Sequence, residues 1–314
     1  MLTLEVWSLR WYLPSLGMIL HTVPLFRANR NKNSGMNPKR TYPIVLSIAG
    51  SDSSGGAGIQ ADLKTFSALG VYGATAITAI TAQNTRGVHS QCPIPPEMVY
   101  DQITAVVEDL HPSFVKIGML SNVGIVLAVA EALSKYSLSI VLDPVMVSSS
   151  GHRLLSVEAQ DIVKQKLLPM AMLITPNLPE MEALTELPLS TYGEKEKAAK
   201  HLLDSGAKAI LLKGGHEEGS VKTDILFTSS PDGIQSSLFS SESIPTRNIH
   251  GTGCTLSSAI TAYLAKGLSM AEAIAAAKSY ISEAIRAGAD IETGQGFGPV
   301  NHGFNPLKMQ VNEI

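Results

Sequence analysis

The stretch of this chain most suited to chemistry is the turn Gly251-Thr252-Gly253-Cys254, which runs directly into an apolar-periodic segment. Two glycines in three residues free the backbone, so that consecutive N–H groups can point toward one place. The segment that follows has the periodicity of a helix, and Gly267 stands where that helix should stop. Because a helix N-terminus carries unpaired N–H groups and partial positive charge, the turn predicts an anion-binding site.

The thiol of Cys254 belongs to this turn and has two interpretations. It lies in or beside the first helical turn, where the helix dipole and a bound phosphate would decide its protonation, and it could act as a catalytic base. It could equally be a small side chain packed beneath the loop, because free cysteines are often buried for packing alone. The residues around it leave both interpretations open.

The elements that position this turn follow an alternating pattern that begins near residue 43. Short apolar runs typical of buried parallel strands alternate with amphipathic helices. The expected strands span 44–50, 74–82, 114–118, 138–143, 172–175 and 209–213, and the expected helices span 57–69, 97–110, 123–133, 156–168, 178–186, 194–205, 252–266 and 270–287. Two later runs, 222–227 and 234–239, predict antiparallel edge strands. The pattern predicts an α/β fold with three layers, α/β/α, around a mostly parallel sheet.

Polar residues and glycines gather where the expected parallel strands end. The residues at these ends are Gly50, Lys116, Met119, Asp143, Thr175, Asn177 and Lys213. Ligands of open α/β sheets bind at the carboxyl ends of the strands. We therefore expect one binding site along this edge of the sheet.

The glycine loop around Gly56 and Gly58 formally matches a dinucleotide-binding fingerprint. Residues 71–90 contain no acidic side chain to bind a ribose hydroxyl, and the chain contains no phosphate-binding P-loop motif. We interpret the loop instead as one that lets a substrate approach the backbone closely.

Several side chains near the strand ends could serve either chemistry or local structure. Asp62 falls inside the apolar stripe of its helix, so it either favours the helix dipole or recognises a ligand hydroxyl or amine. Asn177 and Glu180 could hold a hydrated Mg²⁺ against phosphates or simply cap a helix. Asp143 could join that metal or be a turn residue. Lys213 ends an apolar strand and suits a phosphate contact.

Composition excludes several classes of function. The 314 residues are 45% hydrophobic and 16% charged, with mean hydropathy +0.15 and net charge −3, and no long basic run occurs. Nucleic acid is therefore not an expected partner. Cys92 and Cys254 form neither a disulfide framework nor a zinc-binding spacing, which fits a reducing cytoplasm.

Residues 1–40 differ from the rest of the chain. Their apolar stretch is interrupted by prolines, which disfavours a secretory signal peptide, and it is too short and broken to span a membrane. We expect residues 1–40 to be an extension that is disordered or results from a mis-assigned start. A single domain should span residues 41–308, followed by a tail at 309–314.

Seven segments, in order along the chain, resemble those of the bacterial hydroxymethylpyrimidine and phosphomethylpyrimidine kinases of thiamine biosynthesis, which belong to the ribokinase superfamily. They are Ala49–Lys64, Thr81–Asn84, Lys116–Leu120, Leu142–Val145, Thr175–Glu180, Lys213–His216 and His250–Thr255. The resemblance implies a ribokinase-like fold and a phosphotransferase that uses ATP and Mg²⁺. It further implies phosphorylation of 4-amino-5-hydroxymethyl-2-methylpyrimidine, and then of its monophosphate, in a cytoplasmic homodimer.

The same resemblance implies roles for particular residues. It places Asp62, Gln83, Met119 and Gly50 around the pyrimidine. It places Lys213, Asn177 and Thr175 at the ATP phosphates, Glu180 and Asp143 at the metal, and Gly251, Thr252, Gly253 and Cys254 at the anion hole and base. Pyridoxal kinase is the nearest alternative, and the paired donor and acceptor of Gln83 favour an aminopyrimidine. An inactive ligand-binding homologue is a further alternative, which the intact lysine, acid and cysteine positions disfavour.

Overall fold

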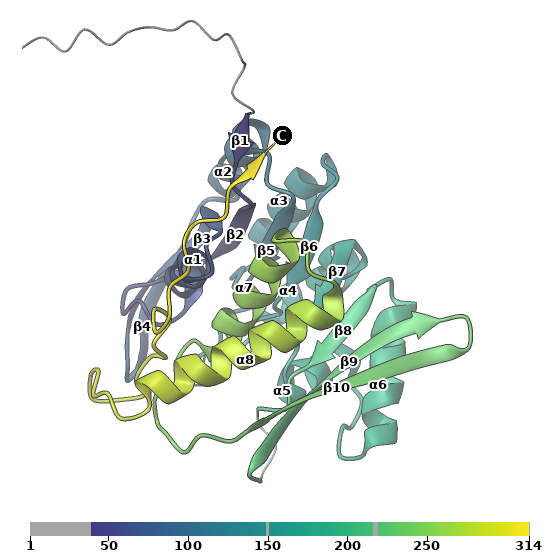
Figure 1. The fold of residues 1–314 in the computed structure, drawn as a ribbon. Helices are drawn as coiled ribbons and strands as arrows, with labels where there is room; N and C mark the ends of the chain where they lie inside the picture. The colour runs from purple at the N-terminus through teal and green to yellow at the C-terminus, as the bar shows by residue number, and fades with distance from the viewer. Residues whose placement is uncertain (1–38, 149–150, 216–218, 314) are drawn as a thin grey trace, which may run out of the picture. The chain divides into compact units, whose positions relative to one another are not determined.

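A nine-stranded sheet forms the central layer of the fold (Figure 1). The computed structural model describes residues 39–148, 151–215 and 219–313, and within them the strand order is β10-β9-β8-β7-β6-β5-β2-β3-β4. The strands are β2 (Ile44–Asp52), β3 (Tyr72–Asn84), β4 (Gly87–Pro93), β5 (Phe114–Ile117), β6 (Ser139–Leu142), β7 (Ala171–Ile174), β8 (Ala209–Leu212), β9 (Val221–Ser230) and β10 (Gly233–Glu242). β2, β3, β5, β6, β7 and β8 run parallel, while β4 pairs antiparallel at one edge and β9 and β10 at the other.

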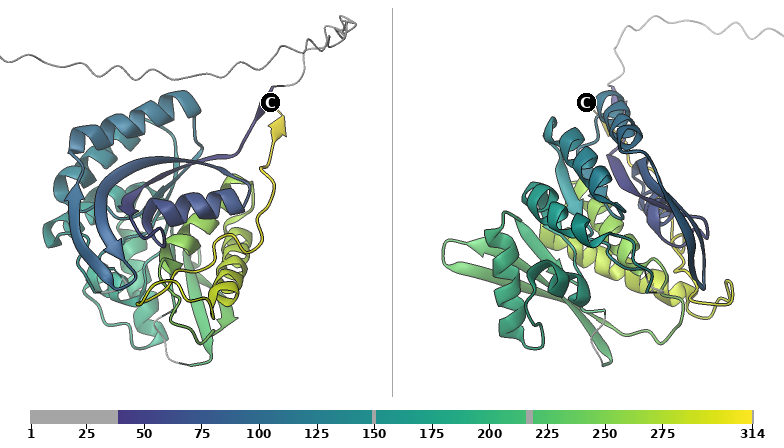
Figure 2. Two further views of the ribbon diagram at one scale, coloured as in Figure 1. Left: turned by 90° about the vertical axis from the view of Figure 1, so that its left-hand side faces the viewer. Right: turned by 180° about the vertical axis from the view of Figure 1, so that it is seen from behind.

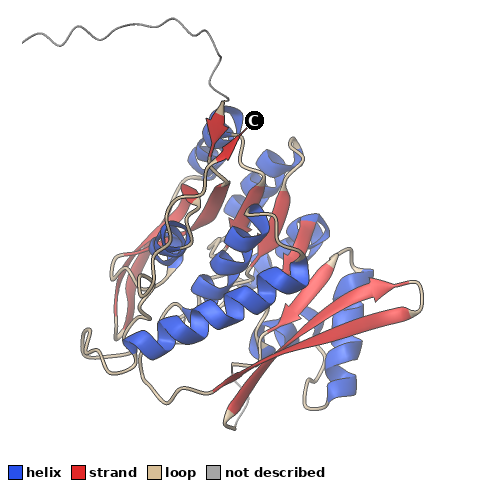
Figure 3. Cartoon of the chain, viewed as in Figure 1, coloured by secondary structure: helices blue, strands red, loops and turns tan. Residues whose placement is uncertain are grey.

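Helices cover both faces of this sheet, as the two views in Figure 2 and the colouring in Figure 3 show. One face packs against α2 (Pro96–Leu110), α3 (Val123–Ser134), α4 (Val157–Ile162), α5 (Leu178–Thr185) and α6 (Tyr192–Asp204). The other packs against α1 (Gly58–Ala68), α7 (Thr252–Ala265) and α8 (Met270–Gly288). Between α4 and β7 the chain forms a π-helical turn, Val163–Leu167, and a 3-10 turn, Leu168–Met170.

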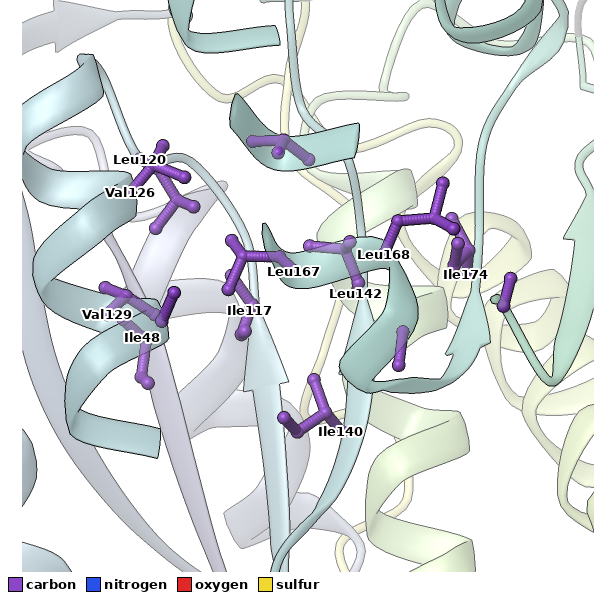
Figure 4. Packing of buried hydrophobic residues seen from close by; sticks show 14 of the residues in the cluster. Ile48, Ile117, Leu120, Val126, Val129, Ile140, Leu142, Leu167, Leu168 and Ile174 are labelled. Atoms are coloured by element: carbon purple, nitrogen blue, oxygen red, sulfur yellow. The ribbon is translucent and has the colours of Figure 1, made fainter. Parts of the chain in front are cut away.

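The sheet separates two hydrophobic cores because successive strand residues point to opposite faces. In β6, Ile140 and Leu142 join the core beneath α2–α6, and Val141 between them joins the core beneath α1, α7 and α8. Figure 4 shows the first core, where Ile140 and Leu142 lie near Ile117 and Leu167. Strands buried on both faces are the reason that the parallel strands appear in the sequence as continuous apolar runs.

A small second sheet joins segments from opposite ends of the described chain. β1 (Arg40–Thr41) pairs antiparallel with β11 (Asn312–Glu313). β11 lies within the segment expected as a tail, while most of the expected extension, residues 1–38, lies outside the described residues. In the described part of the chain, no helix is long and apolar enough to cross a membrane.

The predicted three-layer architecture, with a mostly parallel sheet and antiparallel edges, is confirmed. Each expected strand and helix is present with shifted ends, except that the helix expected at 156–168 changes to a π-helical turn after Ile162. β4 was not expected. Its side chains are mostly exposed and polar, so no apolar run marks it, and it is held by its ladder with β3.

Candidate active site

The carboxyl ends of β6, β7 and β8 bring a lysine between two carboxylates. Lys213 follows β8, and its Nζ lies 2.8 Å from Oδ1 of Asp143, which follows β6. The same Nζ is 3.7 Å from Oε2 of Glu180, in the first turn of α5. Burial disfavours the charged forms of Lys213 and Asp143, but each charge lies next to a charge of opposite sign, whose effect is larger. The pKa of Lys213 is therefore raised and that of Asp143 is lowered. The predicted meeting of Asp143, Glu180 and Lys213 at one edge is therefore what the structure shows.

The side chain of Asp143 is buried at this edge of the sheet, below the surface that a ligand could contact. It is 1% exposed, and its Oδ1 also accepts a hydrogen bond from Thr175 Oγ1 at 3.1 Å. Ser257 Oγ of α7 donates to its Oδ2 at 3.1 Å. Thr175 is itself fully buried. Asp143 thus bonds Lys213 directly and Thr175 bonds Asp143 in turn, while their expected contacts with the metal and ATP stay predictions.

Asn177 and Glu180 form a capping box at the start of α5. Asn177 Oδ1 accepts from the Glu180 N–H at 2.8 Å, and Glu180 Oε2 accepts from the Asn177 N–H at 2.8 Å. Burial raises the pKa of Glu180 to about 6, with Lys213 opposing and Asp143 adding to the shift. The capping interpretation therefore holds, and it leaves Glu180 next to the Lys213 ammonium with an ionisable carboxyl group.

The turn before α7 has the geometry of an anion hole. Gly251, the N-cap residue, has φ of +82°, and a Cβ there would lie 1.8 Å from the Gly56 carbonyl oxygen. α7 has neither a side-chain cap nor an acidic residue in its first turn, so no side chain of the helix start itself satisfies its first N–H groups. A Cβ at Gly253 would lie 3.6 Å from Lys213 Nζ. The first turn of α7, which includes Thr252, therefore faces the lysine.

Cys254 lies where the N-termini of α1 and α7 approach each other, beside the N–H group of Gly58. The residue Cys254 as a whole is half-buried. Burial of the sulfur raises its pKa to about 11, opposed by Lys116 and the Gly58 N–H and reinforced by Asp62 and Asp143. At neutral pH the thiol is therefore protonated in the absence of ligands.

At the other end of this edge, Gln83 belongs to a network that begins at Asp52. The Gln83 Oε1 accepts from Thr81 Oγ1 at 3.2 Å, and its Nε2 lies 3.4 Å from His250 Nε2. His250 Nε2 is 2.8 Å from Asp52 Oδ2. Because the carboxylate can only accept, this imidazole nitrogen carries the proton and donates to Asp52.

Asp52 organises the glycine loop that precedes α1. It accepts hydrogen bonds from the backbone N–H groups of Ser54, Gly56 and Ala57. Burial would raise the pKa of Asp52, but the contacts with His250, Ser54 and Ala57 lower it to about 2. Asp52 and His250 were not predicted as functional residues; the signals that could have found them are an acid directly after a buried strand and a histidine directly before the glycine turn.

Gly50 and Met119 lie against each other beside the glycine loop. A Cβ at Gly50 would lie 2.7 Å from the Met119 sulfur, and Met119 is 7% exposed. Gly58 has φ of +57°, and a Cβ there would lie 2.3 Å from the Gly50 carbonyl oxygen. These close approaches place Gly50 and Met119 together, and their contact with the substrate stays a prediction.

Asp62 has surroundings different from those expected. Its carboxylate is fully buried and accepts from Ser47 Oγ at 2.6 Å and Ser258 Oγ at 2.7 Å. Lys116 Nζ, also fully buried, lies 2.9 and 3.0 Å from its two oxygens. The carboxylate expected to contact a pyrimidine is therefore fully buried and bonded by protein side chains, among them Lys116, a lysine to which no role was assigned from the sequence.

The described residues contain no group of three or more His, Cys, Asp or Glu side chains that could hold a metal ion. Of the two carboxylates beside Lys213, Glu180 is the better placed to bind a metal ion, because both oxygens of Asp143 already accept side-chain hydrogen bonds. Such a site fits Mg²⁺, which is commonly bound by one or two carboxylates together with substrate phosphates and water.

Two surface hollows lie elsewhere. One, of about 660 Å³, lies beside His111–Phe114 and Ser137–Ser139, at the amino ends of β5 and β6. The other, of about 610 Å³, lies between α1 and residues 300–306. Neither is lined by a predicted site residue, and the helix N-termini and charged groups gather instead at the carboxyl edge.

Comparison with known proteins gives consistent matches. The family described as phosphomethylpyrimidine kinase matches residues 52–301. A hydroxymethylpyrimidine/phosphomethylpyrimidine kinase from Rhizobium meliloti (strain 1021) is 50% identical over 260 residues, which are 82% of this chain and 96% of that protein. The crystal structure of a phosphomethylpyrimidine kinase from Clostridium difficile 630 has 46% identity and a TM-score of 0.67, covering 77% of this chain and 99% of that one. A Bacillus subtilis pyridoxal kinase in complex with ADP has 37% identity and a TM-score of 0.76, covering 83% and 98%. The chain therefore belongs to the phosphomethylpyrimidine kinase family and is a phosphotransferase with a ribokinase-like fold.

Proposed function

We propose that this protein transfers the γ-phosphoryl group of ATP to the hydroxymethyl group of 4-amino-5-hydroxymethyl-2-methylpyrimidine, and then phosphorylates the monophosphate to the diphosphate used in thiamine synthesis. The observation that carries the proposal is the uncapped N-terminus of α7, which places Cys254 next to a backbone anion hole and Lys213. The family match and the ADP-bound relative support ATP as the donor.

Phosphoryl transfer leaves the protein mainly the work of alignment and charge stabilisation. The N–H groups of Gly251, Gly253 and Cys254 and the Lys213 ammonium would stabilise the charge on the transferring group. Glu180 would hold Mg²⁺ beside the nucleotide phosphates, where the ion supplies charge neutralisation. The substrate O–H bond breaks as its oxygen bonds to the γ-phosphorus, the proton passes to Cys254 Sγ in the fraction of the enzyme that holds the thiolate, and ADP leaves as the bond between the β–γ bridging oxygen and the γ-phosphorus breaks.

The pyrimidine end is assigned to Gln83, Gly50 and Met119. The Gln83 amide carries a donor and an acceptor that suit an aminopyrimidine edge, and its Oε1 accepts a hydrogen bond from Thr81 Oγ1. Pyridoxal kinase is the second candidate, because a relative of that name has 37% identity over most of both chains. An inactive binding protein would not need Lys213, Glu180 and Cys254 to converge.

Steady-state kinetics with three acceptors test these alternatives: the pyrimidine alcohol, its monophosphate and pyridoxal, each with Mg·ATP. We expect kcat/KM to be highest for the pyrimidine substrates. A higher value for pyridoxal would favour the second candidate, and the absence of acceptor-dependent ADP formation would favour an inactive homologue.

The assembly proposed for this enzyme is a cytoplasmic homodimer. The free thiols of Cys92 and Cys254 suit a reducing compartment, and the dimer follows from the family resemblance. Light scattering of the purified protein should give about twice the mass of the 33.3 kDa chain. A monomer mass across the working concentration range would reject the dimer.

A further inference from the structure

The ion pair between Lys116 and Asp62 lies entirely inside the protein. Both side chains are fully buried, and Lys116 Nζ lies 2.9 Å from Asp62 Oδ1. Removing two charges from water is expensive, and apolar residues of similar volume often stabilise a fold as well as a buried pair does. Stability alone therefore does not explain a lysine at the carboxyl end of β5, beneath the anion hole.

The pair lies one helical turn below Cys254. α1 and α7 contact each other at two levels: Gly58 with Cys254 at their N-termini, and Asp62 with Ser258 one turn further, where Ser258 Oγ donates at 2.7 Å. Residues four apart on a helix lie on the same face, about 5–6 Å apart. Since Lys116 bonds Asp62 from the sheet, its ammonium reaches the space under the thiol.

Gly118 leaves room for this ammonium. A Cβ at Gly118 would lie 2.9 Å from Lys116 Nζ and 3.2 Å from the Ala49 Cβ. Any larger residue at this strand end would therefore press on the lysine head group. The absence of a side chain at Gly118 therefore leaves space for the Lys116 ammonium.

Four charged groups from four different elements surround Cys254. They are Asp62 from α1, Lys116 from β5, Asp143 after β6 and Lys213 after β8. The two carboxylates disfavour a thiolate, and the Lys213 ammonium is already shared between Asp143 and Glu180. Lys116 is the cation with the larger effect on the thiol, whose pKa it lowers against the effect of burial.

We propose that Lys116 is a positioning residue for phosphoryl transfer: anchored by Asp62, its ammonium stabilises negative charge on the Cys254 sulfur, so that the thiolate can accept the hydroxymethyl proton. This inference rests on the proposed role of Cys254 as the base. It gives Asp62 a function beneath the substrate rather than in contact with it. The thiolate accepts one proton from the substrate hydroxyl, and that proton is released to solvent after ADP leaves.

Titration of the thiol tests the proposal directly. In a Cys92→Ser background Cys254 is the only cysteine, so its apparent pKa follows from the rate of alkylation by iodoacetamide as a function of pH. The neutral-pair variant Lys116→Met/Asp62→Asn leaves no unpaired buried charge. Because Lys116 lowers the thiol pKa more than Asp62 raises it, we expect this double variant to raise the apparent pKa only in part. Lys116→Gln, which removes the cation alone, should raise it by about one unit, which slows alkylation about tenfold at a fixed pH below the pKa. The pH profile of kcat should shift in the same direction.

A matched control exists in the pair Lys278–Asp224, at 2.8 Å and with side chains only 11% and 3% exposed. Lys278→Met/Asp224→Asn removes a comparable buried pair that is not among the charges around Cys254. We expect this control to leave the thiol pKa within about 0.3 units of the parent, well below a shift caused by a nearby charge. If the double variant does not fold, Lys116→Gln alone tests the proposal, because its amide can still donate to Asp62.

An unchanged or lowered pKa in the Lys116 variants, or an equal shift in the control, would overturn the inference. Alkylation is measured without ATP or pyrimidine, so it is independent of the proposed substrates. A pKa that rises as expected in a protein with no pyrimidine kinase activity would reject the proposed function while retaining the effect of Lys116 on the thiol.

Discussion

At the scale of single residues, Cys254 combines exposure to the site with a thiol that is harder to ionise than a free cysteine. If it accepts the substrate proton, Cys254→Ala should lower kcat by a factor of about 10²–10⁴ and change KM much less. Steady-state kinetics with the pyrimidine alcohol give this value. Cys92→Ala is the control, because Cys92 is exposed on β4 and should be replaceable without effect. Near-normal turnover of a folded Cys254→Ala protein would remove the base role.

The raised pKa of Cys254 also fixes the direction of the pH dependence. Only the thiolate can accept a proton, and its pKa of about 11 lies above the working range, so the active fraction grows as pH rises. We expect kcat to increase between pH 7 and 9, and this increase to vanish in Cys254→Ala. A kcat that falls over this range in the wild-type enzyme would show that the protonated form is the active one.

The sequence indicated which residues gather at the candidate site, but it did not indicate how deeply each of them is buried. Asp62, Asp143 and Thr175 were placed at the correct edge, but each is bonded by side chains that come from distant parts of the chain, such as Lys116 and Ser257. Spacing along one helix shows that a carboxylate points inward. It does not show whether a ligand or another side chain meets it there.

At the scale of elements, the start of α7 depends on glycine for two reasons. Gly251 has φ of +82°, and a Cβ would collide with the Gly56 carbonyl of the loop before α1. Gly267, after the same helix, has φ of +93° but open space around it. We therefore expect Gly267→Ala to cost about 1 kcal/mol with normal kcat. Gly251→Ala should destabilise more and lower kcat/KM by about 10² or more, since backbone alignment supplies much of the catalysis.

Urea unfolding and kinetics of the two glycine variants separate strain from function. Equal losses of stability, with kcat retained in both, would mean that the contact between the α1 loop and α7 does not shape the anion hole. The comparison is informative because both glycines share the left-handed conformation and flank the same helix.

Asp52 bonds both the loop before α1 and His250, which precedes α7. Its ionisation should therefore make the stability of the fold depend on pH under acidic conditions. Its pKa is lowered to about 2, so its contribution to stability is present above the unfolded value near 4 and is lost as pH falls from 4 toward 2. The shift corresponds to roughly 2 kcal/mol. We expect Asp52→Asn to be less stable than the wild type at pH 7 and to approach it at pH 2.5. Urea unfolding at both pH values measures this, and a stability difference that does not depend on pH would contradict it.

Strands and helices with a buried face were predictable because burial imposes a period on the sequence. β4 lacks such a face and is defined by its hydrogen bonds to β3, and β1 and β11 are two residues each. The antiparallel pair β9–β10 was recognised from its turn residues rather than from apolar alternation, since much of β10 is exposed.

At the scale of the whole molecule, the site is assembled by topology. β2 lies between β3 and β5, so its carboxyl end places the glycine loop beside the ends of both. The right type of fold could be predicted from the alternation of elements alone. The order of the strands, which decides which strand ends are neighbours, has no local signal in the sequence.

The β1–β11 pair predicts how far the chain can be shortened from its N-terminus without loss of activity. It joins Arg40–Thr41 to Asn312–Glu313, whereas the candidate site residues lie between Gly50 and Cys254. A chain that begins at Lys39 keeps this pair, and we expect its kcat/KM to be within about twofold of the full-length value, because it retains every ladder and candidate site residue of the described part of the chain. A chain that begins at Pro43 loses β1, and should unfold at a slightly lower temperature with unchanged kcat. A large loss of kcat/KM in the first truncation would instead assign residues 1–38 a part in catalysis, because that truncation differs from the full-length protein only in lacking them.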